Sequence, residues 1–281
     1  DIDLSPLSEG SSENWYRDVT EIEMSLNDLL RLDFYPIDSY QWDDDFERRD
    51  NPHTMVAGTV TSQTGDVKSR WTALYKGIAR AIKIVEALES GTAQGLTEAQ
   101  VNQYIGEAYF YMGFAHATLA TYWGDAVINK TGMSLEDAYS LKRSPKADVL
   151  AWAYECFDTA IKYLPDAMSS QMRPTKSAAY GFVARFALFH QDWEKAATYA
   201  KNCMDMNVYQ LHPDYGDLFV SSKSPELMFY FKGDNAYNGG VGYYVGNEVK
   251  AFTPRQYGAF CNTGPSFSLY CSYPCVDGLP I

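Results

Sequence analysis

The sequence lacks the features of a membrane-spanning protein and of a nucleic-acid-binding protein. Its longest apolar runs fall well short of the roughly 20 residues that a membrane-spanning helix needs. Basic residues do not cluster beyond pairs such as Arg48-Arg49, and the formal net charge is −13. Binding to a phosphate backbone depends on clustered lysine and arginine, so we predict no nucleic-acid partner. The chain begins at Asp1 with no basic and apolar leader, and we expect that it starts after a removed segment.

Residues for metal binding and catalysis are also sparse. The four histidines are scattered, and the five cysteines are an odd number without paired metal-ligand spacing, so we predict no metal and no cofactor. Cys156 and Cys203 lie in helical patterns and are expected to be small core residues. Asp43, Asp44 and Asp45 are adjacent rather than alternating, unlike the ligands of a calcium loop. The sequence contains no Gly-x-Ser-x-Gly, phosphate-loop or metal-pair motif, and we predict that the protein is not an enzyme.

Aromatic residues, in contrast, are abundant. They make up 15% of the chain and include 22 tyrosines, while 21% of the residues are charged. Tyrosine and tryptophan provide large amphipathic contact areas with little side-chain entropy to lose, so this excess indicates a role in molecular recognition.

Hydrophobic periodicity predicts that the chain is mainly α. Helical patterns run over residues 13–32, 71–88, 97–123, 146–163, 176–191 and 192–206. Five tryptophans lie on these patterns, and we predict that each is a packing residue rather than a sugar platform: Trp15, Trp71, Trp123, Trp152 and Trp193.

The stretch Glu107–Asp125 contains six aromatic residues within one predicted helix. The rings recur at helical spacing on two adjacent stripes, and the glycines and alanines between them would let another helix approach closely. We therefore expect a core helix rather than a ligand-binding face. Gly124 suits the C-terminal cap of this helix.

Two segments fit helix-pair repeats of the tetratricopeptide type. The second helix of such a repeat has the spacing A-x3-F-x2-A-x4-P, which occurs here at Ala153, Phe157, Ala160 and Pro165. Residues 180–203 fit a further helix pair with a tight turn at Gln191-Asp192, although the connection over residues 124–144 is longer than the repeat normally has. We predict a mainly α scaffold of helix pairs with long irregular loops and few short strands, forming a single domain over residues 1–281.

Four segments occur in an order that points to a known family. "RWTALYKGIARAIKIVEAL" is followed by "GEAYFYMGFAHATLATYWGDAVI" and then by "RPTKSAAYGFVARFALFHQDWEKAATYAKNC". The final "YPCVDGLPI" contains a D-G-x-P-I turn. From about Trp71 onward the chain resembles the SusD/RagB (SusD-like) family of outer-membrane nutrient-binding lipoproteins from Bacteroidetes.

This resemblance implies a binding protein at the cell surface rather than an enzyme. Family members capture an oligosaccharide, polysaccharide or peptide and deliver it to a TonB-dependent (SusC-like) transporter in the outer membrane. The resemblance also implies a lipid anchor on an upstream cysteine, because no cysteine occurs between Asp1 and Asn14. Since family members are usually longer than this chain, we expect that a downstream part of the binding surface is missing.

The first candidate binding segment, residues 32–52, follows neither the helix nor the strand period. A sugar ring has an apolar face and a rim of hydroxyls, so its site needs an exposed aromatic ring with polar groups beside it. In the resembling family, the segment before the W-x2-LY helix commonly contributes to the binding face. We predict ligand binding by Tyr40, Trp42, Asp43 and Arg48. The alternative is that Trp42 packs against the core and the acidic residues are simply solvated.

The second candidate segment, residues 232–260, is rich in glycine, asparagine and tyrosine. This composition is typical of adaptable recognition loops. The candidate ligand-binding residues here are Tyr237, Asn238, Tyr243, Tyr244 and Tyr257. The alternative is an ordered surface loop that packs against the missing part.

The prediction as a whole is a lipid-anchored outer-membrane protein that binds glycans at the cell surface. The alternative function is a helical-repeat module that binds a peptide or protein through its concave face. A glycan site requires exposed rings in the loops, whereas a peptide groove requires polar side chains that line the helices.

Overall fold

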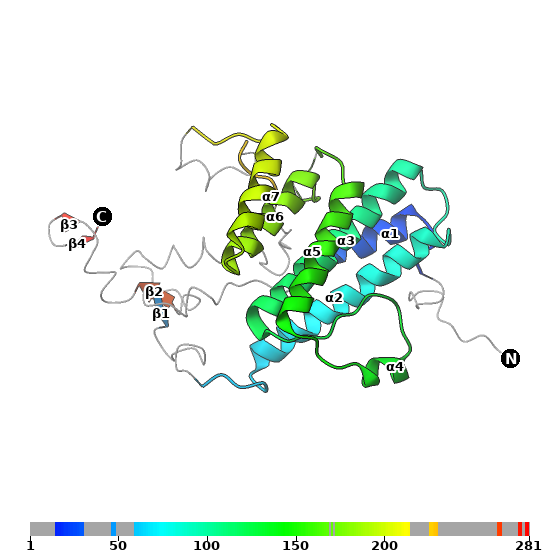
Figure 1. Cartoon of the computed structure of the whole chain (residues 1–281), viewed down its shortest axis with the longest axis horizontal. Helices are drawn as coiled ribbons and strands as arrows, with labels where there is room; N and C mark the ends of the chain where they lie inside the picture. The colour runs from blue at the N-terminus through cyan, green and yellow to red at the C-terminus, as the bar shows by residue number, and fades with distance from the viewer. Residues whose placement is uncertain are drawn as a thin grey trace. The chain divides into compact units, whose positions relative to one another are not determined.

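The computed structural model describes residues 15–30, 46–48, 59–168, 170, 172–213, 225–229, 263–265, 275–276 and 279–280. Its helices are α1 (Val19–Leu30), α2 (Gly65–Glu89), α3 (Glu98–Trp123), α4 (Leu135–Ser140), α5 (Lys146–Tyr163), α6 (Lys176–Phe189) and α7 (Trp193–Asp205). Its strands are β1 (Phe46–Arg48), β2 (Thr263–Pro265), β3 (Cys275–Val276) and β4 (Leu279–Pro280). The predicted mainly α fold class is confirmed (Figure 1).

The chain divides into two compact units. The first unit comprises residues 1–30 and 74–231 and contains most of the helical residues. The second comprises residues 31–73 and 232–281 and contains all four described strands. The single domain over residues 1–281 stays a prediction.

Helix α3 lies at the centre of the first unit. Thr97 begins it with a capping box, in which the Thr97 hydroxyl accepts the Gln100 N–H and the Gln100 side chain accepts the Thr97 N–H. Between Tyr104 and Ala120 the side chains are buried on all sides of the helix, with Tyr109 the half-buried exception. The buried surface of α3 is therefore wider than the two adjacent stripes that the sequence predicts, because α1, α5 and α6 all pack against this helix.

The predicted end of this helix is confirmed. Gly124 has φ 76°, a conformation that favours glycine, and its N–H donates to the Ala120 carbonyl.

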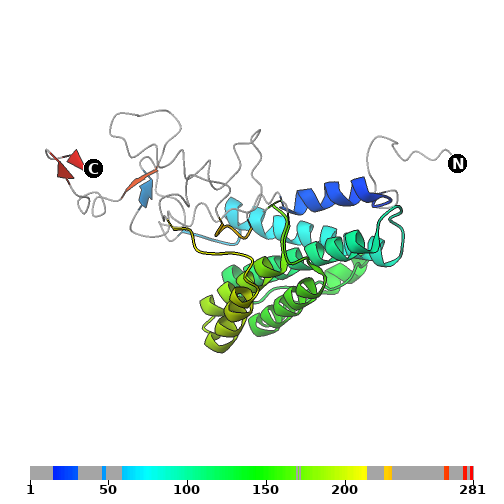
Figure 2. The same cartoon turned by 90° about the horizontal axis from the view of Figure 1, so that it is seen from above.

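Helix α3 forms a close pair with α5. A Cβ atom at Gly113 would lie 3.0 Å from the Ala153 carbonyl oxygen and from the Phe157 ring, so the helices approach as the small residues predict. Ala153, Phe157 and Ala160 are fully buried, in agreement with the repeat spacing. The second pair is α6 with α7, which form a hairpin beside α5 (Figures 1 and 2). The predicted helix pairs are confirmed.

Phenylalanine rings fill the space between the two pairs. The ring of Phe110 in α3 makes edge-on contacts with Phe157 at 5.7 Å, Phe182 at 5.3 Å and Phe229 at 5.2 Å between centroids. These rings come from α5, α6 and the segment 225–229. The α3 rings that lie in this cluster belong to the core, as the sequence predicts.

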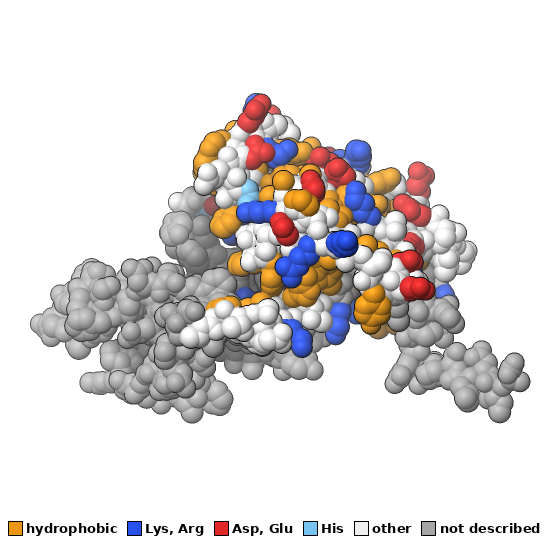
Figure 3. Space-filling view, turned by 60° about the horizontal axis from the view of Figure 1, so that its bottom comes forward, with side chains coloured by type: hydrophobic (Ala, Val, Ile, Leu, Met, Phe, Trp, Pro, Cys, Tyr) orange, Lys and Arg blue, Asp and Glu red, His pale blue; other side chains and the backbone are white. Residues whose placement is uncertain are grey.

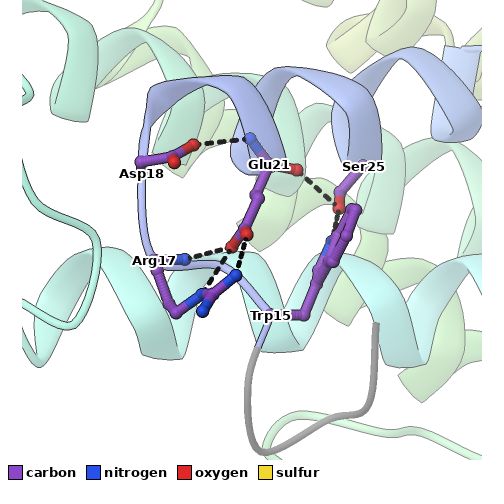
Figure 4. A network of polar contacts seen from close by, with 5 residues as sticks. All are labelled: Trp15, Arg17, Asp18, Glu21 and Ser25. Atoms are coloured by element: carbon purple, nitrogen blue, oxygen red, sulfur yellow. Dashed lines mark hydrogen bonds and ion pairs between the residues drawn. The ribbon is translucent and has the colours of Figure 1, made fainter. Parts of the chain in front are cut away.

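Helix α1 begins later than the periodic pattern indicates. Trp15 precedes the helix and donates from its indole Nε1 to Ser25 Oγ at 2.8 Å (Figure 4). The Asp18 carboxylate accepts the Glu21 N–H at 3.0 Å, and the Glu21 carboxylate accepts the Arg17 N–H at 2.7 Å. This reciprocal capping fixes the start of α1 at Val19.

Two further boundaries differ from the prediction. Helix α2 begins at Gly65 rather than near Trp71. The periodic pattern misses this start, because the first turns of the helix are polar and carry little hydrophobic period. The connection 124–144 contains the short helix α4, whose N-cap Ser134 accepts the Asp137 N–H at 3.1 Å.

Candidate functional site

Eight of the nine predicted ligand-binding residues lie outside the described residues. They are Tyr40, Trp42, Asp43, Tyr237, Asn238, Tyr243, Tyr244 and Tyr257. The ninth, Arg48, is the last residue of strand β1. Both candidate segments, residues 32–52 and 232–260, fall within the ranges of the second unit.

Strand β1 pairs the first candidate segment with a stretch of chain that lies just after the second. It lies within the first segment and pairs antiparallel with β2, which follows the second segment by two residues (Figure 1). The partners are Phe46 with Pro265, Glu47 with Gly264, and Arg48 with Thr263. Residues 215 positions apart in the chain are thus neighbours across one ladder, where partner Cα atoms are about 5 Å apart. Sequence reasoning proposed the two segments separately and missed this pairing, because a three-residue strand leaves no readable period.

In the first unit, hydrogen bonds fix the connection over residues 124–144 to the helices. The Tyr75 hydroxyl donates to the Val127 carbonyl at 2.9 Å and accepts the Val127 N–H at 2.8 Å. The Gly132 N–H donates to the Glu86 carboxylate at 2.8 Å, which ties the connection to α2. Burial raises the pKa of Tyr75 to about 12, so the phenol keeps its proton at pH 7. The connection 124–144 is therefore part of the scaffold.

The surface of this unit carries no field of a single sign on the side seen in Figure 3. Lysine and arginine side chains are interspersed there with acidic and hydrophobic ones (Figure 3).

His116 is a structural residue rather than a proton-transfer group. It is completely buried, and its Nδ1 lies 2.8 Å from the Met112 carbonyl oxygen, to which it donates. Its Nε2 accepts the Asn129 N–H at 3.5 Å, so the ring is the neutral Nδ1–H tautomer. Burial lowers the pKa of His116 to about 4.

A buried ion pair joins α3 to the connection that precedes α6. The Glu107 side chain is 1% exposed, and its Oε2 lies 2.5 Å from Arg173 Nη1. Gln103 donates to the other carboxylate oxygen at 2.8 Å. Burial raises the pKa of Glu107, while Arg173 and Gln103 oppose this shift. All of these partners come from the protein itself, and the pair links α3 to the connection before α6.

The tryptophans differ in exposure. Trp152 is half-buried, edge-on to the His116 ring and covered by the Lys130 ammonium at 4.1 Å from its centroid, which fits the predicted packing role. Trp193 is 61% exposed, so the predicted packing role is wrong for this residue. It is the first residue of α7.

The described part of the chain also bears on metal binding, membrane spanning and cysteine chemistry. There, no three His, Cys, Asp or Glu side chains gather in a way that could hold a metal ion. None of the helices in this part combines the length and the apolar character that a bilayer span requires. Cys156 is buried and Cys203 half-buried, both as free thiols, and burial raises the pKa of each.

Comparison with known proteins identifies the family. A family model described as "Starch-binding associating with outer membrane" matches residues 15–188, which is more than half of the chain. The chain belongs to the SusD-like family. Family membership confirms the resemblance that the ordered segments indicate.

Individual relatives agree with this assignment. A SusD-like protein of Bacteroides ovatus is 23% identical over 203 residues, which cover 68% of this chain and 37% of the relative. A SusD-like carbohydrate binding protein from Bacteroides fragilis has a TM-score of 0.70 at 20% identity, covering 95% of this chain and 55% of that one. A structure determined with a xylogluco-oligosaccharide has a TM-score of 0.60 at 20% identity, covering 75% of this chain and 43% of that one. The structural likenesses show that the fold is shared.

The matched region is short compared with the relatives. The chain spans little more than a third of the length of the curated relatives it matches and about half of the similar solved structures.

Proposed function

We propose that this SusD-like protein captures oligosaccharides at the cell surface and delivers them to a TonB-dependent transporter of the outer membrane. Two findings support the carbohydrate part. The matching family is described as starch-binding, and one protein of the same fold was solved with a xylogluco-oligosaccharide. The description of that family also names association with the outer membrane, which supports the proposed location.

The observation that carries the proposed site is the pairing of β1 with β2. Trp42 and Asp43 precede Phe46 by four and three residues, so the chain can separate them from the ladder by no more than about 14 Å. Tyr257 precedes Thr263 by six residues, which limits it to about 22 Å from the same ladder. The other candidates of the second segment, Tyr237, Asn238, Tyr243 and Tyr244, are proposed from the residue composition of that segment.

In the proposed site the aromatic and polar residues have separate tasks. The apolar face of a sugar ring stacks on Trp42 and on tyrosines such as Tyr40 and Tyr257. Its hydroxyls donate to the Asp43 carboxylate and accept from the Arg48 guanidinium. Both tasks concern binding, and the proposal includes no bond-breaking step.

The proposal is tested by affinity electrophoresis of the full chain in gels that contain starch, xyloglucan or mucin. We expect retardation by at least one neutral polysaccharide, and no release of reducing sugar in a parallel incubation. Trp42→Ala should abolish most of the retardation, while Trp42→Phe, which keeps a ring, should retain most of it. Retardation that is identical in wild type and Trp42→Ala would remove Trp42 from the site. If no polymer retards the wild type, the alternative function of peptide or protein capture becomes the better account.

The location and the transporter partner need a separate experiment on the native protein in its own cells. We expect it in the outer-membrane fraction, open to added protease on intact cells, and co-purifying in detergent with a TonB-dependent transporter. Recovery in the cytoplasmic fraction would contradict this part of the proposal.

A further inference from the structure

The turn between α6 and α7 carries three large apolar side chains that face solvent. Leu188 is 56% exposed, Phe189 67% and Trp193 61%. We call residues 188–194 the hairpin tip. Exposed apolar side chains grouped in this way mark binding surfaces more often than single ones do.

The backbone of the hairpin tip is fixed by hydrogen bonds. The His190 N–H donates to the Phe186 carbonyl at 2.9 Å, and the Asp192 N–H donates to the Ala187 carbonyl at 2.9 Å. Gln191 makes the turn with φ 64°, and the Asp192 carboxylate caps α7 by accepting the Lys195 N–H at 3.2 Å. The exposed rings therefore sit on an ordered backbone, and a ligand would lose little binding energy to ordering it.

His190 anchors the hairpin tip to α3. The Thr121 hydroxyl donates to the Ala117 carbonyl at 2.7 Å, so its oxygen accepts from His190 Nε2 at 3.0 Å. The His190 ring also meets the Phe189 ring edge-on, with centroids 5.4 Å apart. The exposed Phe189 ring is thus held in place from α3 through a side-chain contact.

The polar groups of the hairpin tip indicate the class of ligand. Gln191, Asp192 and Glu194 are exposed next to the rings. A carboxylate accepts hydrogen bonds and donates none, and one cap bond leaves most of the acceptor capacity of Asp192 available. A sugar offers the complement, since it combines an apolar ring face with several hydroxyl donors.

We propose that the hairpin tip is a second carbohydrate contact, where a sugar ring stacks on Trp193 or Phe189 and donates hydroxyl groups to Asp192 or Glu194. This inference takes its ligand class from the proposed function. It adds a contact in the first unit, separate from the candidate segments of the second unit.

The test compares four full-length proteins by affinity electrophoresis in starch and xyloglucan: wild type, the double variant Phe189→Ala/Trp193→Ala, Met204→Ala and Trp42→Ala. Met204 is the matched control, because it lies on α7 and is 69% exposed but has no ring. We expect the double variant to bind the polymer about five- to tenfold more weakly, with an unchanged melting temperature. The Met204→Ala control should bind like wild type.

The outcomes separate the two proposals. If the double variant is retarded like wild type while Trp42→Ala is not, the hairpin tip is not a carbohydrate contact and the proposed function stands. Loss of retardation in the double variant but not in Trp42→Ala supports the hairpin tip and overturns the site at the candidate segments. If no polysaccharide retards the wild type, both proposals are overturned.

Discussion

Helix α3 and the α6–α7 turn are both rich in aromatic side chains, but their surroundings differ. Phe110 in α3 is surrounded by rings from three other segments, whereas Phe189 and Trp193 in the hairpin tip face solvent. The two regions belong to successive helix pairs of the same type. The helical period alone therefore does not decide whether a ring belongs to the core or to the surface, because neighbouring helices and turns decide it.

The largest difference between the α3 core and the exposed surface of α7 should appear in their ion pairs. Arg173→Ala leaves the Glu107 carboxylate buried without its cation, and we expect a loss of about 3–5 kcal/mol in the free energy of unfolding. Lys201→Ala removes an exposed pair with Asp205 on α7 and should cost less than about 0.5 kcal/mol. Chemical denaturation of both variants measures the contrast. Similar losses would contradict the burial assigned to the α3 pair.

The contact between α2 and α3 should be nearly as sensitive. A Cβ atom at Gly77 would overlap the Tyr111 ring, which is buried and cannot swing out, so Gly77→Ala should cost about 3 kcal/mol. Gly65 lies in the same helix with nothing within 4 Å of an added Cβ, and Gly65→Ala should be neutral or slightly stabilising. Thermal melts of the two variants separate overpacking from a general effect of alanine in α2.

A smaller effect should appear on acidification, through His116 in α3. Its pKa is about 4 in the folded chain, below the ordinary 6.5, so the unfolded chain takes up a proton first as the pH falls. The contribution of the neutral His116 ring to the free energy of unfolding is fully present above about pH 6.5 and is lost as the pH falls toward 4. Between pH 7 and pH 5 this contribution falls by about 2 kcal/mol. In His116→Phe this part of the pH dependence should disappear. An unchanged slope would mean that other groups cause it.

The smallest effect on stability should come from the hairpin tip. Trp193→Ala removes an exposed ring and should change the free energy of unfolding by less than about 0.5 kcal/mol. Phe110→Ala, in contrast, empties the centre of the ring cluster and should cost about 3–5 kcal/mol. Denaturant midpoints of the two variants give the comparison. A large loss for Trp193→Ala would show that the hairpin tip is packed rather than free to bind.

Much of the helical scaffold can be predicted from the sequence. The stretch ending at Gly124 has a helical period, a capping glycine and small residues, and each has the predicted place in the structure. The start of α1 could not be predicted, because it depends on the Trp15 bond to Ser25 and on the reciprocal capping by Asp18 and Glu21. The exposure of Trp193 could not be predicted, because a helical pattern counts every tryptophan as apolar and does not record whether its side chain is covered.

The candidate site was harder to predict for a physical reason. The residues of segments 32–52 and 232–260 follow no period, so composition was the available guide. The ladder that joins Arg48 to Thr263 depends on contacts between residues 215 positions apart, and no local pattern records such a pairing. The chemistry of the site can therefore be proposed from residue types, while the pairing of residues 46–48 with residues 263–265 comes from the structure.

The most direct test of the central claim is calorimetric titration of the full chain with a malto-oligosaccharide and a xylogluco-oligosaccharide. The variants Trp42→Ala and Tyr257→Ala each represent one of the two candidate segments, and the two residues precede β1 and β2 in the chain. We predict that the wild type binds at least one of the two ligands and that each variant weakens this binding by at least about fivefold, while Trp42→Phe keeps most of it. Binding that is unchanged in both alanine variants would contradict a carbohydrate site formed by these segments.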